Sequence, residues 1–235
     1  MKASNVLAAL IAQADPARAK SSEWFFKAGP GEYGEGDEFL GIPVPAQRKI
    51  AKQFAELPLE DIRELLFNSK HEARLTALFI LVLQFKKASP IEQKDLYNFY
   101  LRHTNRINNW DLVDSSAHHI VGGYLVDKDR KVLRELAQSQ SLWERRIAII
   151  ATAKFISLGQ SKDTFDIATI LLHDKHDLIH KAVGWMLREV GKNCGEDTEE
   201  EFLKQHYKVM PRTMLRYAIE RFDEPLRQRY LRGEV

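Results

Sequence analysis

Apolar residues along the chain recur three and four positions apart, which is the period of an amphipathic helix. Leu75, Leu78, Phe79 and Val82 form one such set, and Ile147, Ile150, Ala151 and Phe155 form another. No stretch between turn signals alternates apolar and polar residues as a half-buried strand would. The pattern therefore predicts an all-α fold.

Capping signals mark several helix starts. Asp15 precedes Pro16, an N-cap residue followed by proline at the first helical position. The segments 89–92 (SPIE) and 141–144 (SLWE) have the serine-to-glutamate spacing of a capping box. We expect a helix to begin at each of these three places.

A weak repeat runs through the chain. Stretches that open with polar residues and pass into apolar ones begin near Glu72, Asp111, Glu144, His180 and Arg212. They lie roughly 32 to 39 residues apart, the spacing of HEAT-like helix pairs that bury their faces by stacking. We expect one domain over residues 1–235, an α-α superhelix of about six helix pairs. An irregular helical bundle is the alternative, because helices of similar length also produce an apparent period.

The composition limits which binding partners and which cell compartment are consistent with the sequence. The chain has 35 basic and 33 acidic residues and a net charge of +2, so a nucleic-acid partner requires its basic residues on one face. The single cysteine, Cys194, excludes an internal disulfide and a four-cysteine metal site. No apolar run reaches the roughly 18 residues of a membrane span, and the start does not resemble a signal peptide. We expect a cytoplasmic protein.

One segment lacks the helical pattern of apolar residues. Residues 29–36 (GPGEYGEG) hold four of the twelve glycines, which predicts a loop over 29–37. No Gly-Lys-Ser/Thr follows and its charges are negative, so it is not a phosphate-binding loop.

Three segments place unusual side chains on helix faces. Trp110 and Asp114 lie four residues apart, Arg146 stands near a helix start, and a third face carries Lys181, Trp185 and Arg188. Each has a structural explanation as a core tryptophan, a solvated arginine or a capping aspartate. All three segments begin the second helix of a predicted repeat, so they would line one wall. Cations suit phosphates, indoles suit a sugar or a cationic ring, and a carboxylate suits a developing positive charge.

Taken in order, these segments resemble one family. The sequences WDLVDS (110–115), WERR (143–146), KAVGWMLRE (181–189) and FLGI (39–42) are together similar to the AlkD family of alkylpurine DNA glycosylases, over about residues 25–192. The resemblance implies a HEAT-like superhelix that cups duplex DNA and excises cationic N3- or N7-alkylated purines. We accordingly expect a monofunctional, metal-independent glycosylase without a cofactor, acting as a monomer on double-stranded DNA that contains alkylated bases.

The resemblance also assigns residues. Asp114 matches the catalytic carboxylate, Trp110 and Trp185 match aromatics beside the deoxyribose of the lesion, and Arg146 matches a phosphate contact. Phe25 stands where the family often has a tyrosine, and Val44 precedes Pro45 where some relatives have threonine. These departures bear on substrate range. The other expected DNA-binding residues are Arg48, Lys49, Lys52, Lys154, Lys181, Arg188 and Lys192.

Two other functions compete with excision. The run 173–177 (HDKHD) with His180 suits a metal-dependent hydrolase, although Asp caps and exposed histidines are common between helices. A HEAT-repeat binder of damaged or branched DNA that has lost catalysis would show similar helices, although it would not need an inward carboxylate between tryptophans.

Overall fold

The structure is a computed structural model that describes all residues from 1 to 235, and it is almost entirely helical. The helices are α1 (Ala3–Ile11), α2 (Pro16–Phe25), α3 (Val44–Gln53), α4 (Leu59–Leu66), α5 (His71–Lys87), α6 (Pro90–Arg102), α7 (Trp110–Asp114), α8 (Lys131–Ala137), α9 (Leu142–Ala151), α10 (Ala153–Ile156), α11 (Lys162–Ile170), α12 (Asp177–Cys194), α13 (Glu196–His206), α14 (Arg212–Ala218) and α15 (Glu224–Arg232), with short helical turns η1 (Thr104–Arg106), η2 (His118–Gly122) and η3 (Ile219–Arg221). The one β-bridge, between Glu38 and Lys70, belongs to no sheet. The prediction of an all-α fold is confirmed.

The chain divides into two compact units, residues 1–116 and residues 117–235. Each unit contains several packed helices. The expectation of one domain over residues 1–235 stays a prediction.

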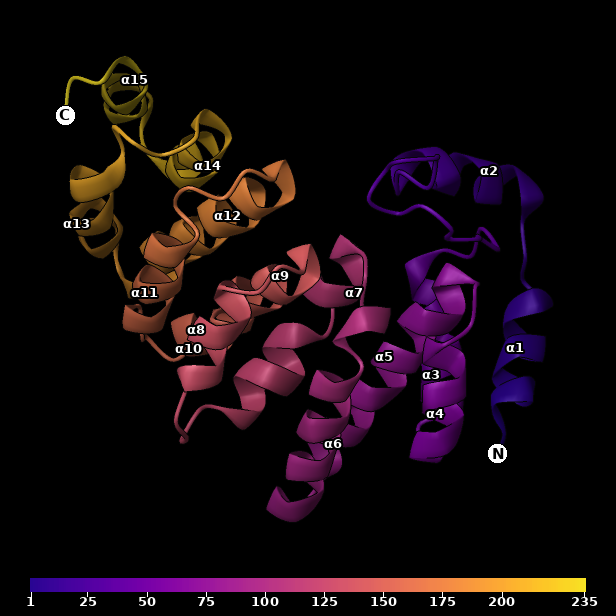
Figure 1. Ribbon diagram of the computed structural model, residues 1–235. Coiled ribbons are helices and arrows are strands. Elements are labelled where there is room, and N and C mark those ends of the chain that lie inside the picture. The colour runs from indigo at the N-terminus through magenta and orange to yellow at the C-terminus, as the bar shows by residue number, and fades with distance from the viewer. The chain divides into compact units, whose positions relative to one another are not determined.

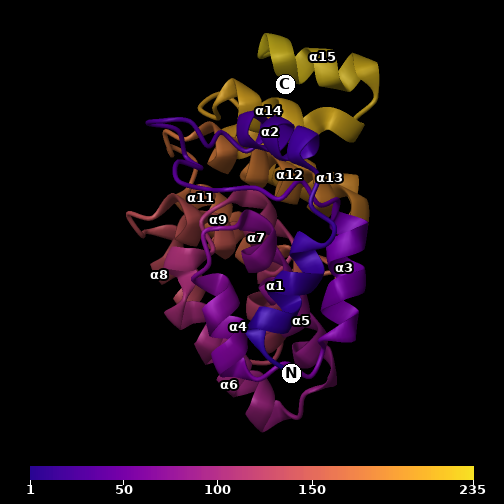
Figure 2. The same cartoon turned by 90° about the vertical axis from the view of Figure 1, so that its right-hand side faces the viewer.

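The first unit is built around α5. This helix is mostly apolar, and all of its residues from 71 to 82 are buried, as expected of a helix enclosed by others. Helices α3 and α4 each pack against α5, beside which Figure 1 shows them, and α1, α6 and α7 also contact it. The turned view of Figure 2 shows α1 beside α4 and α5.

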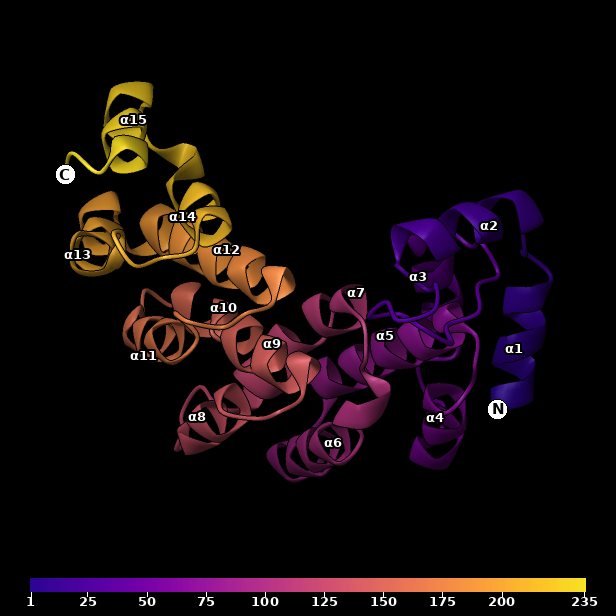
Figure 3. The same cartoon turned by 45° about the horizontal axis from the view of Figure 1, so that its top comes forward.

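The second unit is built around α12, which packs against α9, α11, α13 and α14. Figure 3 shows α12 beside α13 and α14. The contact with α14 is close because position 184 is glycine. A Cβ atom at Gly184 would lie 2.4 Å from the carbonyl oxygen of Met214, so any larger residue would force the two helices apart.

The predicted caps are present. Asp15 accepts hydrogen bonds from the amides of Ala17 and Arg18 at the start of α2. Ser89 forms the full capping box of α6 with Glu92. Ser141 accepts from the amide at position 144 at the start of α9. Each cap stabilises its helix by about 1 kcal/mol.

The repeat starts inferred from the sequence coincide with helix starts. Position 72 lies in the first turn of α5, position 111 in α7, position 144 in α9, position 180 near the start of α12 and position 212 at the start of α14. Within the second unit, α8 packs against α9 and α11 against α12, as expected of helix pairs. No helix is long and apolar enough to cross a membrane.

Candidate functional site

The residues expected to act fall into two groups, one in each unit. The first unit holds Phe25, Arg48, Lys49, Lys52, Trp110 and Asp114, and the second holds Arg146, Lys154, Lys181, Trp185, Arg188 and Lys192.

In the first unit, the short helix α7 carries both Trp110 and Asp114. Asn109 has an extended backbone and its side-chain oxygen accepts a hydrogen bond from the amide of Trp110 at 2.8 Å, which starts the helix. Trp110 opens α7 and Asp114 closes it, so the two side chains lie one turn apart on one face. Both are half-buried, which leaves part of each side chain open to a ligand.

Two phenylalanines pack against the indole of Trp110. Phe26 stacks on it with ring centroids 5.4 Å apart, and Phe25 meets it edge-on at 5.7 Å. Phe25 is 54% exposed, so it and Trp110 together present an aromatic surface to solvent. Phe25 and Trp110, both expected from the sequence to contact DNA, therefore lie in contact with each other, and their roles stay predictions. Phe26 was not among the residues expected from the sequence.

A buried charge network lies beneath this aromatic surface. Nδ1 of His71 lies 2.9 Å from Oδ2 of Asp37, and its Nε2 lies 2.8 Å from Oδ2 of Asp111. Arg74 pairs with the other oxygen of Asp37 at 2.5 Å. The side chains of His71, Asp37 and Arg74 are at most 3% exposed, and that of Asp111 is 13% exposed.

The network shifts the protonation of its members. Burial opposes a charge on His71, but the charge of Asp111 and the hydrogen bonds to Asp111 and Asp37 outweigh burial and raise the pKa of His71 to about 9. Burial by itself would raise the pKa of Asp37, yet the hydrogen bond from His71 and the charge of Arg74 hold it below its usual value. His71 is therefore an imidazolium at neutral pH.

Glu72, the neighbour of His71, shapes the loop before α3. Its carboxylate accepts hydrogen bonds from the amides of Leu40, Gly41 and Ile42, at 2.7 to 3.3 Å. Gly41 has φ of +78°, and a Cβ there would lie 2.2 Å from the carbonyl oxygen of Asp15. The FLGI segment that supported the family resemblance thus has a structural role in this fold. A cavity of about 220 Å³ beside this loop is lined in part by His71 and Asp111.

Asp114 lies at the other end of α7, close to the core. Tyr100 is fully buried, and its hydroxyl lies 3.0 Å from the hydroxyl of Ser116. Burial raises the pKa of Tyr100, and the negative charge of Asp114 raises it further. The carboxylate of Asp114 therefore stands near a low-dielectric region, where its charge acts more strongly than in water.

The expected cations of the first unit lie on α3. Arg48 places its guanidinium 4.1 Å from the ring centroid of Phe79 and remains exposed. Lys49 and Lys52 are exposed and have no acidic partner. All three are accessible to an anion.

In the second unit, the expected residues lie on α9, α10 and α12. Arg146 is only 5% exposed, and its guanidinium donates to the carbonyl oxygen of Leu178 at 2.5 Å. Its role as a phosphate contact stays a prediction, and the structure gives it a second role in joining α9 to α12. Trp185 and Lys154 are half-buried.

The cations of α12 have acidic neighbours. Lys181 pairs with Asp177 at 2.7 Å, Lys192 lies 4.0 Å from Glu189, and Arg188 pairs with Glu220 on η3. A phosphate would have to replace these partners, which are partly exposed and easily exchanged.

The histidine-rich segment 173–177, which was a candidate metal site in the sequence, instead caps the N-terminus of α12. His176 accepts a hydrogen bond from the amide of Leu178 at 3.1 Å. Asp174 pairs with Arg145 at 2.6 Å, and His180 bonds to the carbonyl oxygen of residue 174. No group of three or more potential ligands is arranged to hold a metal ion.

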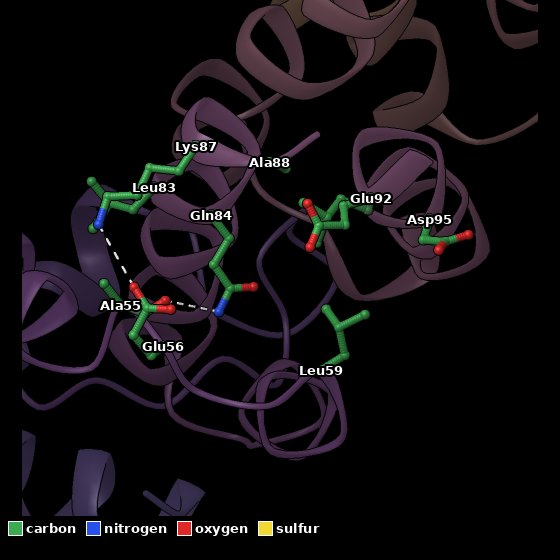
Figure 4. A pocket seen from close by; sticks show the side chains of 10 residues that line it. Ala55, Glu56, Leu59, Leu83, Gln84, Lys87, Ala88, Glu92 and Asp95 are labelled. Atoms are coloured by element: carbon green, nitrogen blue, oxygen red, sulfur yellow. Dashed lines mark hydrogen bonds and ion pairs between the residues drawn. The ribbon is translucent and has the colours of Figure 1, made fainter. Parts of the chain in front are cut away.

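A hollow of about 370 Å³ in the first unit contains none of the expected residues. It lies between α4, α5 and α6, and Figure 4 shows Gln84 and Glu92 among the side chains around it. There Gln84 donates to the carbonyl oxygen of Ala55 at 2.8 Å, and Lys87 pairs with Glu56.

Comparisons with known proteins bear on the family and the fold of the chain. The family model for the DNA alkylation repair enzyme matches residues 6–222, nearly the whole chain. A search of curated protein sequences found no match. A solved structure from Enterococcus faecalis, described as a predicted DNA alkylation repair enzyme, superposes with a TM-score of 0.69 at 18% identity, covering 90% of this chain and 98% of the other. The structural likeness confirms the α-α repeat fold, and the match of the family model shows that the chain belongs to the DNA alkylation repair enzyme family.

Proposed function

We propose that the protein is a DNA glycosylase that hydrolyses the N-glycosidic bond of cationic N3- or N7-alkylated purines in duplex DNA. Membership of a DNA alkylation repair family supports DNA as the partner. The observation that carries the proposal is the pairing of Trp110 and Asp114 on one face of α7, with the indole backed by Phe26. This face offers an aromatic surface and a carboxylate to the same ligand.

The chemistry requires little more than these groups. Alkylation at N3 or N7 gives the purine a positive charge, so it leaves as a neutral base with the electrons of the glycosidic bond. Positive charge then develops on the deoxyribose, as in glycoside hydrolysis. A carboxylate about 4 Å from that charge, at an effective dielectric constant near 20, stabilises it by roughly 4 kcal/mol. An indole face contributes about 0.5–2 kcal/mol more.

Asp114 takes the role of this carboxylate. Water adds its oxygen to the sugar carbon and loses a proton, which Asp114 or solvent accepts, leaving an abasic site. No step uses a protein nucleophile or a metal ion. Trp110 and Trp185 pack beside the deoxyribose, and each acts from its own unit.

Phosphate contacts come from the cations. Lys49 and Lys52 are already available, whereas Lys181, Arg188 and Lys192 exchange an acidic neighbour for a phosphate. Arg48 in the first unit and Lys154 in the second each contribute a further phosphate contact, and Phe25 contacts the strand near the lesion. Arg146 is assigned a phosphate contact by the family resemblance, although only 5% of the residue is exposed.

The decisive experiment is a release assay on duplex oligonucleotides that contain 7-methylguanine or 3-methyladenine. We expect the free base and an intact strand with an abasic site, and we expect these products to form equally well in excess EDTA. We also expect the enzyme to be a monomer located in the cytoplasm. Trapping of a protein–DNA adduct with borohydride would contradict the mechanism, because it requires a lysine Schiff base. Tight binding of alkylated duplex without base release would instead indicate a catalytically silent binder.

A further inference from the structure

Three separate segments of the first unit meet at His71. The residue opens α5, Asp37 ends the glycine-rich loop, and Asp111 lies in the first turn of α7. Both ring nitrogens of His71 are within 2.9 Å of a carboxylate oxygen. His71 therefore joins the loop to the helix that carries the candidate catalytic side chains.

This bridge needs a charged ring. A neutral imidazole has one N–H group, whereas two carboxylates facing its two nitrogens require two donors. The imidazolium supplies both, and with Arg74 it balances the charges of Asp37 and Asp111 within the buried network. Unpaired carboxylates at these depths would be costly, so the network holds together as a unit.

Two routes connect His71 to Trp110. One runs through the backbone, because Asp111 is the next residue in α7. The other runs through Phe26, whose ring lies 4.7 Å from the His71 ring and 5.4 Å from that of Trp110, centroid to centroid. The orientation of the indole thus depends on His71 from two sides.

We propose that His71 is a positioning residue that, as the imidazolium bridge between Asp37 and Asp111, fixes α7 so that Trp110 and Asp114 are held in their working orientation. The proposal builds on the glycosylase function, although its structural part can be tested without activity. His71 is buried and does not touch the substrate.

Other charged groups surround the bridge without replacing it. Glu72 is committed to the amides of residues 40–42, and Arg106 donates to the carbonyl oxygens of Leu66 and Asn68. Arg18, on α2, lines the adjacent cavity. None of these bonds to Asp111, so loss of the His71 proton leaves one carboxylate of the bridge facing a ring nitrogen lone pair.

The test uses the full-length protein labelled with 5-fluorotryptophan, whose four tryptophans give four ¹⁹F signals. The signal of Trp110 is assigned with Trp110→Phe. In the unsubstituted protein we expect this signal to move with a midpoint near pH 9, the pKa raised by Asp111 and Asp37 against burial. His71→Gln should displace or broaden the Trp110 signal at neutral pH and abolish its titration, and Asp111→Asn should shift the midpoint to lower pH.

His103→Gln is the matched control. His103 belongs to the same unit and bonds to the carbonyl oxygen of Phe99, and its ring contacts are with Phe99 and Phe67 instead of with the rings around Trp110. It should leave the Trp110 signal unchanged. A Trp110 signal that is identical in His71→Gln and in the unsubstituted protein would overturn the proposal.

Single-turnover excision supplies the second measurement. We expect His71→Gln to slow base release by about 10- to 100-fold, while the Kd for DNA stays within about twofold, because orientation and not contact is lost. An unsubstituted protein that releases no base would refute the glycosylase function, while the NMR result would still decide the role of His71. If His71→Gln does not fold, the alkaline titration of the unsubstituted protein and of Asp111→Asn decides it.

Discussion

The ring of Phe26 stacks on the indole of Trp110 with their planes 21° apart and their centroids 5.4 Å apart. Phe26 also lies nearly parallel to Phe39, at 5.3 Å, so the indole rests on a layer of aromatic rings. Such offset stacks are worth about 0.5–1.5 kcal/mol beyond their buried area. The stack of Phe26 and Phe39 therefore restricts the orientation of the indole of Trp110, part of which is exposed to solvent.

Replacing Asp114 by asparagine should slow excision without weakening DNA binding. Asp114→Asn keeps the shape of the side chain and removes the charge that stabilises the sugar cation. Loss of one preorganised electrostatic group costs about 10²–10³ in rate, or 2.7–4 kcal/mol. Single-turnover release of 7-methylguanine measures the rate, and fluorescence anisotropy measures the affinity. A lower melting temperature with an unchanged rate for the folded fraction would mean that Asp114 is only structural.

Removing an indole should affect both rate and affinity. Trp110→Ala and Trp185→Ala each delete an aromatic surface of the kind that contacts a sugar, so we expect a smaller rate loss than for Asp114→Asn and a weaker Kd. Trp110→Phe retains a ring over Phe26 and should recover part of both. The role assigned to the indole is wrong if Trp110→Ala binds and excises like the unsubstituted protein.

DNA binding should depend strongly on salt and little on sequence. With about four to six phosphates neutralised, the slope of log K against log salt should be near −4 to −5. Lys49→Gln and Lys52→Gln should each reduce the slope by about 1. Lys131→Gln on α8, which lies outside the predicted basic surface and pairs with Glu135, is the control and should leave the slope unchanged. A slope near zero would exclude this surface.

The His71 bridge should make stability depend on alkaline pH. The pKa of His71 is about 9 in the folded chain against an ordinary 6.5, so its stabilisation is complete below about pH 6.5 and disappears as pH rises to 9. A difference of this size corresponds to about 3 kcal/mol. The gap in Tm between the unsubstituted protein and His71→Gln should therefore shrink between pH 6 and pH 9.5. A gap that stays constant over this range would mean that His71 does not change protonation there.

Glu199 in the second unit should lower stability at neutral pH. Burial, followed by the charge of Glu196, raises its pKa from 4.5 to about 9 although Arg188 opposes the shift. Folding at pH 7 must therefore protonate a group that is ionised in the unfolded chain. Glu199→Gln should raise the free energy of unfolding by up to about 3 kcal/mol at pH 7 and by little at pH 4. Urea denaturation at both pH values checks this, and an equal gain at both would contradict it.

The features found from the sequence were those that depend on neighbours along the chain. Periodicity indicated the helices, the serine and aspartate caps marked three of their starts, and the four-residue spacing placed Trp110 and Asp114 on one face. Local signals of this kind need no knowledge of tertiary packing.

The buried network was missed because its members are distant in sequence. His71 meets Asp37 across 34 positions and Asp111 across 40. One signal was available: Glu72 and Arg74 are charged residues in the apolar helix α5, and buried charges require partners. The sequence of the glycine-rich loop likewise did not indicate that Asp37 is buried in the core.

Gly184 limits how the second unit can evolve. Because its missing side chain lets the backbone of α12 lie against that of α14, the rotational setting of α12 depends on that one position. Trp185 is the next residue, so even Gly184→Ala would turn or lift the indole along with the helix. We therefore expect position 184 to tolerate no residue with a side chain, including residues that leave the charge and hydrophobicity of the surface unchanged.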